Sequence, residues 1–374
     1  MHRTTFVSRT GTILIVAMLL LSSFQYEVAA QREEMDTVVV LYDTTHRQQF
    51  DARDPDYDLK LMLDVVNAST KYIVKLNEED PLNDTILSDV DILIIADPDN
   101  SSVFRQEELE SIVEFLANGS SLLALGDPTI SQNSTYWVAD QTFQDLGENY
   151  ALNNFFDGIN MTGVRFSVNH TTSAGLPTQR ADTMFDYEHA LNETVPWVIE
   201  LDSSTWDTTH PIFKDINSLI TMTATLKPID DASIVARSHE TTFAQYRRGP
   251  NTWANLSYPN MSLDAFNEVP LSYSAINGTF PPWLAAFQYD TSRVIVAGST
   301  LMFTARTLDL PLEDDRTDLR WFYQADNSRL FMNMLNWLSE GSTEPPGAIV
   351  PMAIISSAIL VVGVAFYIFK RIKR

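Results

Sequence analysis

The stretch DILIIADPDNSSVFRQEELESIVEFLANGSSLLALGDP, residues 91–128, decides the fold. Its residues 91–96 and 121–125 contain the continuous apolar runs 92–96 and 122–125, as in strands buried on both faces of a parallel sheet. Between these runs, apolar residues recur at the spacing of one helix face, at Leu109, Ile112, Val113 and Leu116. The stretch therefore predicts a strand–helix–strand unit with a right-handed crossover.

Segments on both sides extend this pattern. Upstream, residues 37–42 and 72–76 read as strands with an amphipathic helix between them. Downstream, residues 283–289 and 293–298 read as a hairpin, and the final helix has one apolar face, made by Phe331, Met334, Leu335 and Leu338. The predicted fold class is α/β, with a doubly wound, mostly parallel sheet.

The regular pattern is interrupted by a long polar and aromatic stretch. We therefore predict one ectodomain, residues 31–341, whose core comprises residues 36–128 and 282–340. Residues 129–281 form an elaborated insertion, in which only short strand-like pieces such as 233–236 are recognisable.

The C-terminus predicts a membrane anchor. Residues 347–369 carry no charge, and crossing a bilayer as a helix takes about 20 apolar residues. A short linker, residues 342–346, precedes this transmembrane helix, and the tail 370–374 contains four basic residues. Basic residues beside a span stay on the cytoplasmic side. We thus predict a single-pass protein of the cell membrane, with its N-terminal domain extracellular and its C-terminus cytoplasmic.

The N-terminus predicts a signal peptide, residues 1–30. Arg3 and Arg9 precede an apolar run, and small residues ending at Ala30 form a cleavage site. The alternative is an uncleaved N-terminal anchor, which would give the chain two spans.

Composition limits the partners and the compartment. Residues 31–346, the ectodomain with its linker, have 19 basic and 48 acidic residues, a formal charge of −29. We expect no nucleic-acid partner, because phosphate binding needs clustered Lys and Arg. The chain has no cysteine, although secreted eukaryotic domains usually contain disulfides. This favours a prokaryotic, archaeal cell surface. Eleven glycosylation sequons predict a glycoprotein, at Asn67, Asn83, Asn100, Asn118, Asn133, Asn160, Asn169, Asn192, Asn255, Asn260 and Asn277.

Polar residues follow the predicted parallel strands at the edge where α/β proteins bind ligands. Asp43 and His46 follow the first strand, Asp97 the third and Asp127 the fourth. These four residues are the candidate ligand-binding site, with chemistry suited to a hard cation or a polar ligand. The alternative is that the aspartates cap helices and tighten turns and that His46 is a hydrogen-bonded loop residue. We assign no catalytic residue, no metal and no cofactor.

Other motifs give weaker signals. The sequence contains no Gly-x-Ser-x-Gly, His-Glu-x-x-His, Walker or Gly-x-Gly-x-x-Gly motif. The segment DTMFDYEH, residues 182–189, is acidic and is either a cation site or a solvated loop, of which we favour the loop.

Several stretches together resemble a known family. They are Asp43-x-x-His46-x-x-x-Phe50, Leu87-x-Asp89-Val-Asp91, Phe104-x-x-Glu107-Glu108-Leu109, residues 118–127, residues 293–299 and Asp326-Asn327-x-Arg329-Leu-Phe-x-Asn333 with the helix that continues to Leu338. This pattern is similar to the GIFT domain, named for the GldG gliding-motility protein and intraflagellar transport, which has many archaeal membrane relatives. The resemblance implies the fold of class I glutamine amidotransferases without the catalytic cysteine.

The resemblance implies a catalytically inert module that binds or scaffolds a protein or glycan partner. Many relatives carry Gly-Asp after the last strand where this chain has Gly298-Ser299, which weakens any acidic site carried over from them. One alternative is an accessory subunit of a membrane complex, either an oligosaccharyltransferase or an ABC transporter. Another is a metal-assisted enzyme that uses Asp43, His46, Asp97 and Asp127.

Overall fold

The computed structural model of the chain describes most of the predicted ectodomain. The described residues are 37–129, 146–168, 172–173, 176–177, 180–192, 195–246, 271–275, 278, 280–308 and 320–342. The predicted signal peptide, transmembrane helix and cytoplasmic tail lie outside these ranges, as does the linker after residue 342. Within these ranges, no helix has the length and apolar character needed to cross a membrane.

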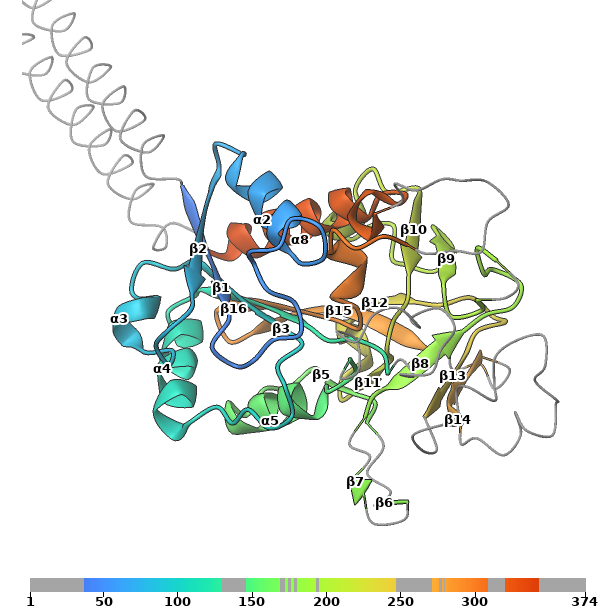
Figure 1. Ribbon diagram of the computed structural model, residues 1–374, viewed down its shortest axis with the longest axis horizontal. Helices are drawn as coiled ribbons and strands as arrows, with labels where there is room; N and C mark the ends of the chain where they lie inside the picture. The colour runs from blue at the N-terminus through green and yellow to red at the C-terminus, as the bar shows by residue number, and fades with distance from the viewer. Residues whose placement is uncertain are drawn as a thin grey trace, which may run out of the picture.

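The main sheet has seven strands in the order β12-β15-β16-β4-β3-β1-β2 (Figure 1). Their bounds are β1 Val38–Asp43, β2 Tyr72–Asn77, β3 Ile92–Ala96, β4 Ser121–Leu125, β12 Ile234–Arg237, β15 Pro282–Tyr289 and β16 Ser292–Ala297. From β2 to β16 the neighbouring strands are parallel, whereas β15 forms the predicted antiparallel hairpin with β16. The structure therefore confirms a mixed α/β fold with a largely parallel sheet.

Helices cover both faces of this sheet (Figure 1). The helices are α2 Lys60–Asn67, α3 Asp84–Leu87, α4 Gln106–Ala117, α5 Tyr150–Gly158 and α8 Asn327–Ser342. Residues of α2 and α8 share one apolar cluster, and residues of α4 and α5 share another. Side chains of β1 alternate between the clusters, because Val40 and Tyr42 join the first and Leu41 the second. Both faces are thus buried, which explains the continuous apolar runs of the strands.

The range 129–281 contains short strands and contributes one strand to the main sheet. Its small sheets pair β5 Val164–Phe166 with β11 Leu226–Pro228, β9 Ile199–Asp202 with β10 Ser218–Thr221, β6 Thr172–Ser173 with β7 Leu176–Pro177, and β13 Phe243–Tyr246 with both β8 Asp182–Phe185 and β14 Leu271–Ser274. The strand β12 comes from the same range and pairs antiparallel with β15. The division into core and insertion stays a prediction.

Four 3-10 helices complete the described elements, at η3 Pro211–Phe213, η4 Asp231–Ser233, η6 Leu301–Phe303 and η7 Trp321–Tyr323. Between β16 and η6, Gly298 allows a close approach of two backbones. A Cβ atom on Gly298 would lie 2.1 Å from the carbonyl oxygen of Ala224. Only glycine fits there, so the end of β16 can pack against the segment that leads into β11.

Candidate functional site

The four predicted residues lie at the carboxyl ends of three adjacent parallel strands. Asp43 is the last residue of β1, Asp97 follows β3 directly, and Asp127 comes two residues after β4. The structure places them in two groups, Asp43 with His46 and Asp97 with Asp127. Residues 48–49 connect the groups, because Gln48 Nε2 donates to Asp43 Oδ2 (3.1 Å) and the backbone N–H of Gln49 donates to the carbonyl of Asp97 (3.2 Å).

The carboxylate of Asp43 is fully buried, and both of its oxygens have hydrogen-bond partners. His46 Nδ1 lies 2.7 Å from Asp43 Oδ2. Asp43 Oδ1 accepts hydrogen bonds from Thr45 Oγ1 and Asn77 Nδ2, both at 2.9 Å. With these donors around it, Asp43 acts as the acceptor that fixes the loop after β1.

The imidazole of His46 is buried between two carboxylates. Its Nε2 lies 3.4 Å from Oε1 of Glu108, and its ring stacks on Phe104 with 3.8 Å between centroids. Glu108 also accepts from the backbone N–H groups of Leu82 (3.1 Å) and Arg105 (2.9 Å). The resulting Asp43–His46–Glu108 network ties the loop after β1 to the first turn of α4.

Asp97 occupies a strained turn between β3 and α4. Its φ is +38°, in the left-handed region that residues other than glycine seldom adopt. Its side chain is fully buried, and neither carboxyl oxygen has a hydrogen-bond partner among the described residues. Burial, followed by the charges of Asp127 and Glu148, raises the pKa of Asp97 well above its usual value.

Asp127 is the second buried carboxyl group of this pair. Its Oδ1 accepts from the backbone N–H groups of Thr300 (3.1 Å) and Leu301 (3.0 Å). Its Oδ2 has no hydrogen-bond partner in the part of the chain that the structure describes. Burial raises its pKa to about 8, although the hydrogen bonds from Leu301 and Thr300 oppose the shift. Asp97 and Asp127 are therefore neutral acids over much of the pH range in which exposed aspartates are charged.

An ion pair lies next to these acids. Glu148 accepts from Arg180 (2.9 Å) and from the backbone N–H of Asn100 (2.5 Å). Among the side chains that the structure describes, no group of three His, Cys, Asp or Glu residues is arranged to hold a metal ion. The strand ends thus present neutral acids and satisfied carboxylates, which suit recognition and structural roles.

The segment 182–189 is not the solvated loop that the sequence favours. Asp182 is buried in β8, where it accepts hydrogen bonds from Ser272 and from Thr225 Oγ1 (2.5 Å). Burial raises the pKa of Asp182 to about 6, although these hydrogen bonds oppose the shift. Burial alone would also raise the pKa of Asp186, but hydrogen bonds from Thr242, Thr241 and the backbone outweigh it and lower the pKa. Asp186 organises the turn that carries His189, because its Oδ1 accepts from the backbone N–H groups of Glu188 (2.9 Å) and His189 (3.0 Å).

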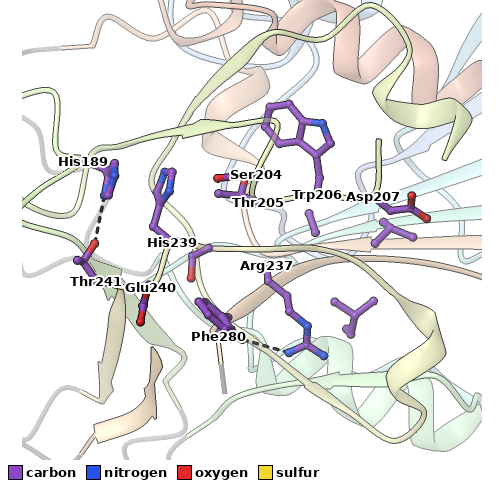
Figure 2. A pocket seen from close by; sticks show the side chains of 14 residues that line it. His189, Ser204, Thr205, Trp206, Asp207, Arg237, His239, Glu240, Thr241 and Phe280 are labelled. Carbon is purple, nitrogen blue, oxygen red and sulfur yellow. Dashed lines mark hydrogen bonds between the residues drawn. The ribbon is translucent and has the colours of Figure 1, made fainter. Parts of the chain in front are cut away.

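A cavity of about 650 Å³ lies beside β12, and its lining includes none of the four predicted residues at the carboxyl ends of β1, β3 and β4. We call it the β12 cavity; its lining includes His189, Trp206, Asp207, Arg237, His239 and Glu240 (Figure 2). The cavity as a whole was not predictable from sequence motifs, because its residues come from separate turns and one short strand.

The predicted glycosylation sites divide by exposure. Asn67, Asn83, Asn118 and Asn160 are exposed, whereas Asn100 and Asn192 are half-buried. The remaining five sequons, at Asn133, Asn169, Asn255, Asn260 and Asn277, lie outside the described residues. Glycosylation itself stays a prediction.

Comparisons with known proteins place this α/β chain in a family. Residues 46–337 match the family described as "ABC-type uncharacterized transport system". The chain belongs to this family of ABC transport auxiliary proteins. No curated protein matches the chain. The match fits the GIFT-like resemblance drawn from the sequence.

Solved structures with a similar arrangement share little sequence with this chain. The N-terminal domain of mmIFT52 is 14% identical with a TM-score of 0.42, and the alignment covers 83% of this chain and 100% of that one. The cytoplasmic protein STM3548 from Salmonella typhimurium is 11% identical with a TM-score of 0.39, over 80% of this chain and 98% of that one. A ThuA-like protein from Bacteroides uniformis is 11% identical with a TM-score of 0.38, over 81% and 91%.

Proposed function

We propose that this chain is a non-enzymatic accessory component of an ABC-type transport system, anchored in the cell membrane with its amidotransferase-like domain outside. The family match, which extends over residues 46–337, supports an association with ABC transport. The anchor rests on the uncharged stretch 347–369 and the basic tail after it. In this proposal the domain binds a protein or glycan partner of the transporter.

The observation that carries the non-enzymatic part is the state of Asp97. A strained turn between a strand and a helix is where some α/β enzymes expose a nucleophile. Here the residue at the strained position is an aspartate that is fully buried. Its pKa is raised by burial and by neighbouring acids, and a protonated carboxyl group is a poor nucleophile. This supports a domain in which Asp97 supplies no nucleophile.

Affinity purification of the full chain from native membranes in a mild detergent tests the proposal. We expect an ATPase subunit with a Walker motif and a membrane permease to co-purify in comparable amounts, as mass spectrometry can measure. Recovery of the chain alone would contradict an accessory role. Recovery of oligosaccharyltransferase subunits would instead support a role in a glycan-transfer complex. A chain ending at residue 342 is the control, because it lacks the anchor.

A further inference from the structure

The β12 cavity contains a pair of stacked histidines that the strand-end site does not use. The rings of His189 and His239 are nearly parallel, with 3.6 Å between centroids and 9° between planes. Figure 2 shows them side by side at one end of the cavity. Each ring covers one face of the other, so the pair presents ring edges, and therefore nitrogen atoms, to a ligand.

Hydrogen bonds fix which nitrogen of each ring carries a proton. His239 Nε2 lies 2.9 Å from the carbonyl oxygen of Glu200, which can only accept, so Nε2 bears the hydrogen. His189 Nδ1 lies 3.2 Å from Oδ2 of Asp186, and that oxygen also accepts from the hydroxyls of Thr241 and Thr242. His189 Nδ1 is therefore the donor. The other nitrogens, Nε2 of His189 and Nδ1 of His239, form no hydrogen bond to any described residue.

The charges around the cavity argue against an anionic ligand. Asp207 and Glu240 place two carboxylates in the lining. Arg237 is the one Lys or Arg among the lining residues; it donates to the carbonyl of Phe280 (3.1 Å) and to Asp231 (3.1 Å). An anion would thus meet repulsion from two sides and a guanidinium that already has partners.

The same cavity offers an apolar surface. Trp206, which stacks on Phe213 with 5.2 Å between centroids, and Phe280 both line it. A ligand that fits needs hydroxyl donors for the imidazole nitrogens and the carboxylates, and C–H faces for the aromatic rings. The volume of about 650 Å³ is within the range of small-molecule sites.

We propose that the β12 cavity binds a neutral saccharide, with the edges of the stacked His189–His239 pair as the hydrogen-bonding platform. This site is separate from the strand-end carboxyl groups. It does not depend on the association with a transporter, so either proposal can fail without the other.

Calorimetric titration of the purified full chain tests the saccharide site directly. The probes are a panel of neutral mono- and disaccharides, followed by an array of longer surface glycans to distinguish free sugars from glycan chains. We expect at least one neutral saccharide to bind. A panel and array without binding, or binding of a polyamine or a peptide in place of every saccharide, would overturn the proposal.

Substitutions locate the binding in the cavity. The variant His189→Phe keeps a ring stacked on His239 and removes both nitrogens, so we expect the Kd to rise about tenfold, the effect of losing one hydrogen bond to a ligand. Glu240→Gln, at an exposed residue of the lining, should also weaken binding and serves if His189→Phe does not fold. The matched control is Glu107→Gln, an exposed glutamate on α4 outside the cavity. Unchanged affinity in both cavity variants would contradict the proposal.

Discussion

At the scale of single residues, a buried network of polar side chains surrounds His46. His46 is held between the carboxylates of Asp43 and Glu108 and packs on Phe104. A histidine held by a carboxylate also occurs in enzymes, where the other ring nitrogen reaches an exposed nucleophile. Here both ring nitrogens lie next to carboxylates inside the protein, so the network joins the loop after β1 to α4.

Replacing His46 tests this structural role. We expect His46→Ala to lower the free energy of unfolding by roughly 3 kcal/mol, because it leaves two buried carboxylates without their shared partner. Urea unfolding followed by tryptophan fluorescence measures the loss. Arg53→Ala, which breaks an ion pair with Glu78 at the surface, is the control and should change little. An unaffected His46→Ala variant together with a stoichiometric bound metal in the native protein would favour the metal-assisted enzyme.

The acid pair predicts a dependence of stability on pH. The pKa of Asp127 is about 8 in the folded protein and near 3.8 when exposed, so the folded state holds the proton more tightly. The stabilisation is complete below about pH 4 and is lost as the pH rises towards 8, by at most about 1.4 kcal/mol per pH unit. Urea unfolding at several pH values should show this decline in the wild type and a flatter profile in Asp127→Asn. Equal slopes in both proteins would contradict the assignment.

At the scale of elements, close packing at strand ends sets the geometry of the sheet. The turn after β16 passes so near to Ala224 that only glycine fits at position 298. The Gly298-Ser299 sequence, which departs from the Gly-Asp of many GIFT relatives, therefore keeps the residue that the packing requires. Ser299 is buried, and its Oγ accepts from the backbone N–H of Met302 (3.2 Å) at η6.

A Cβ at this position should be costly. We expect Gly298→Ala to destabilise the protein by roughly 3 kcal/mol, because the new atom meets backbone that cannot move aside easily. Gly119→Ala is the matched comparison, since that glycine has a φ of +92° but open space around it, and only backbone strain of about 1 kcal/mol applies. Thermal unfolding of both variants measures the two losses of stability. A smaller loss for Gly298→Ala than for Gly119→Ala would contradict the prediction.

The parallel strands were predictable because burial on two faces leaves a continuous apolar run, as in residues 92–96. The strand-end rule also located Asp43, Asp97 and Asp127. Glu108 was missed because an acid in the first turn of a helix is explained equally well by the helix dipole, and its contact with His46 is tertiary. In the range 129–281, strands of two to four residues pair with distant partners, such as β8 with β13. Strands this short show no hydrophobic periodicity from which such pairings could be predicted.

At the scale of the whole molecule, the account joins an α/β domain of an ABC transport family to a predicted membrane anchor. If the domain lies outside the cell as we propose, its high acidity would favour solubility there. The anchor has a direct test. After an alkaline wash, we expect the full chain to stay with the membranes and a chain ending at residue 342 to appear in the soluble fraction, as immunoblotting of both fractions would measure. Release of the full chain by the wash would contradict the anchor.

We propose that the domain supports a transporter without doing chemistry, and the Asp97→Asn variant tests this proposal. The amide has the shape of the protonated acid and cannot replace it as a nucleophile or as a proton donor of similar strength. The measurement is the amount of intact transporter recovered and its transport rate, in cells with wild-type chain, with Asp97→Asn and without the chain. The account predicts near wild-type values for Asp97→Asn and a loss without the chain. A folded, membrane-bound Asp97→Asn chain that gives as little transport as no chain would contradict it.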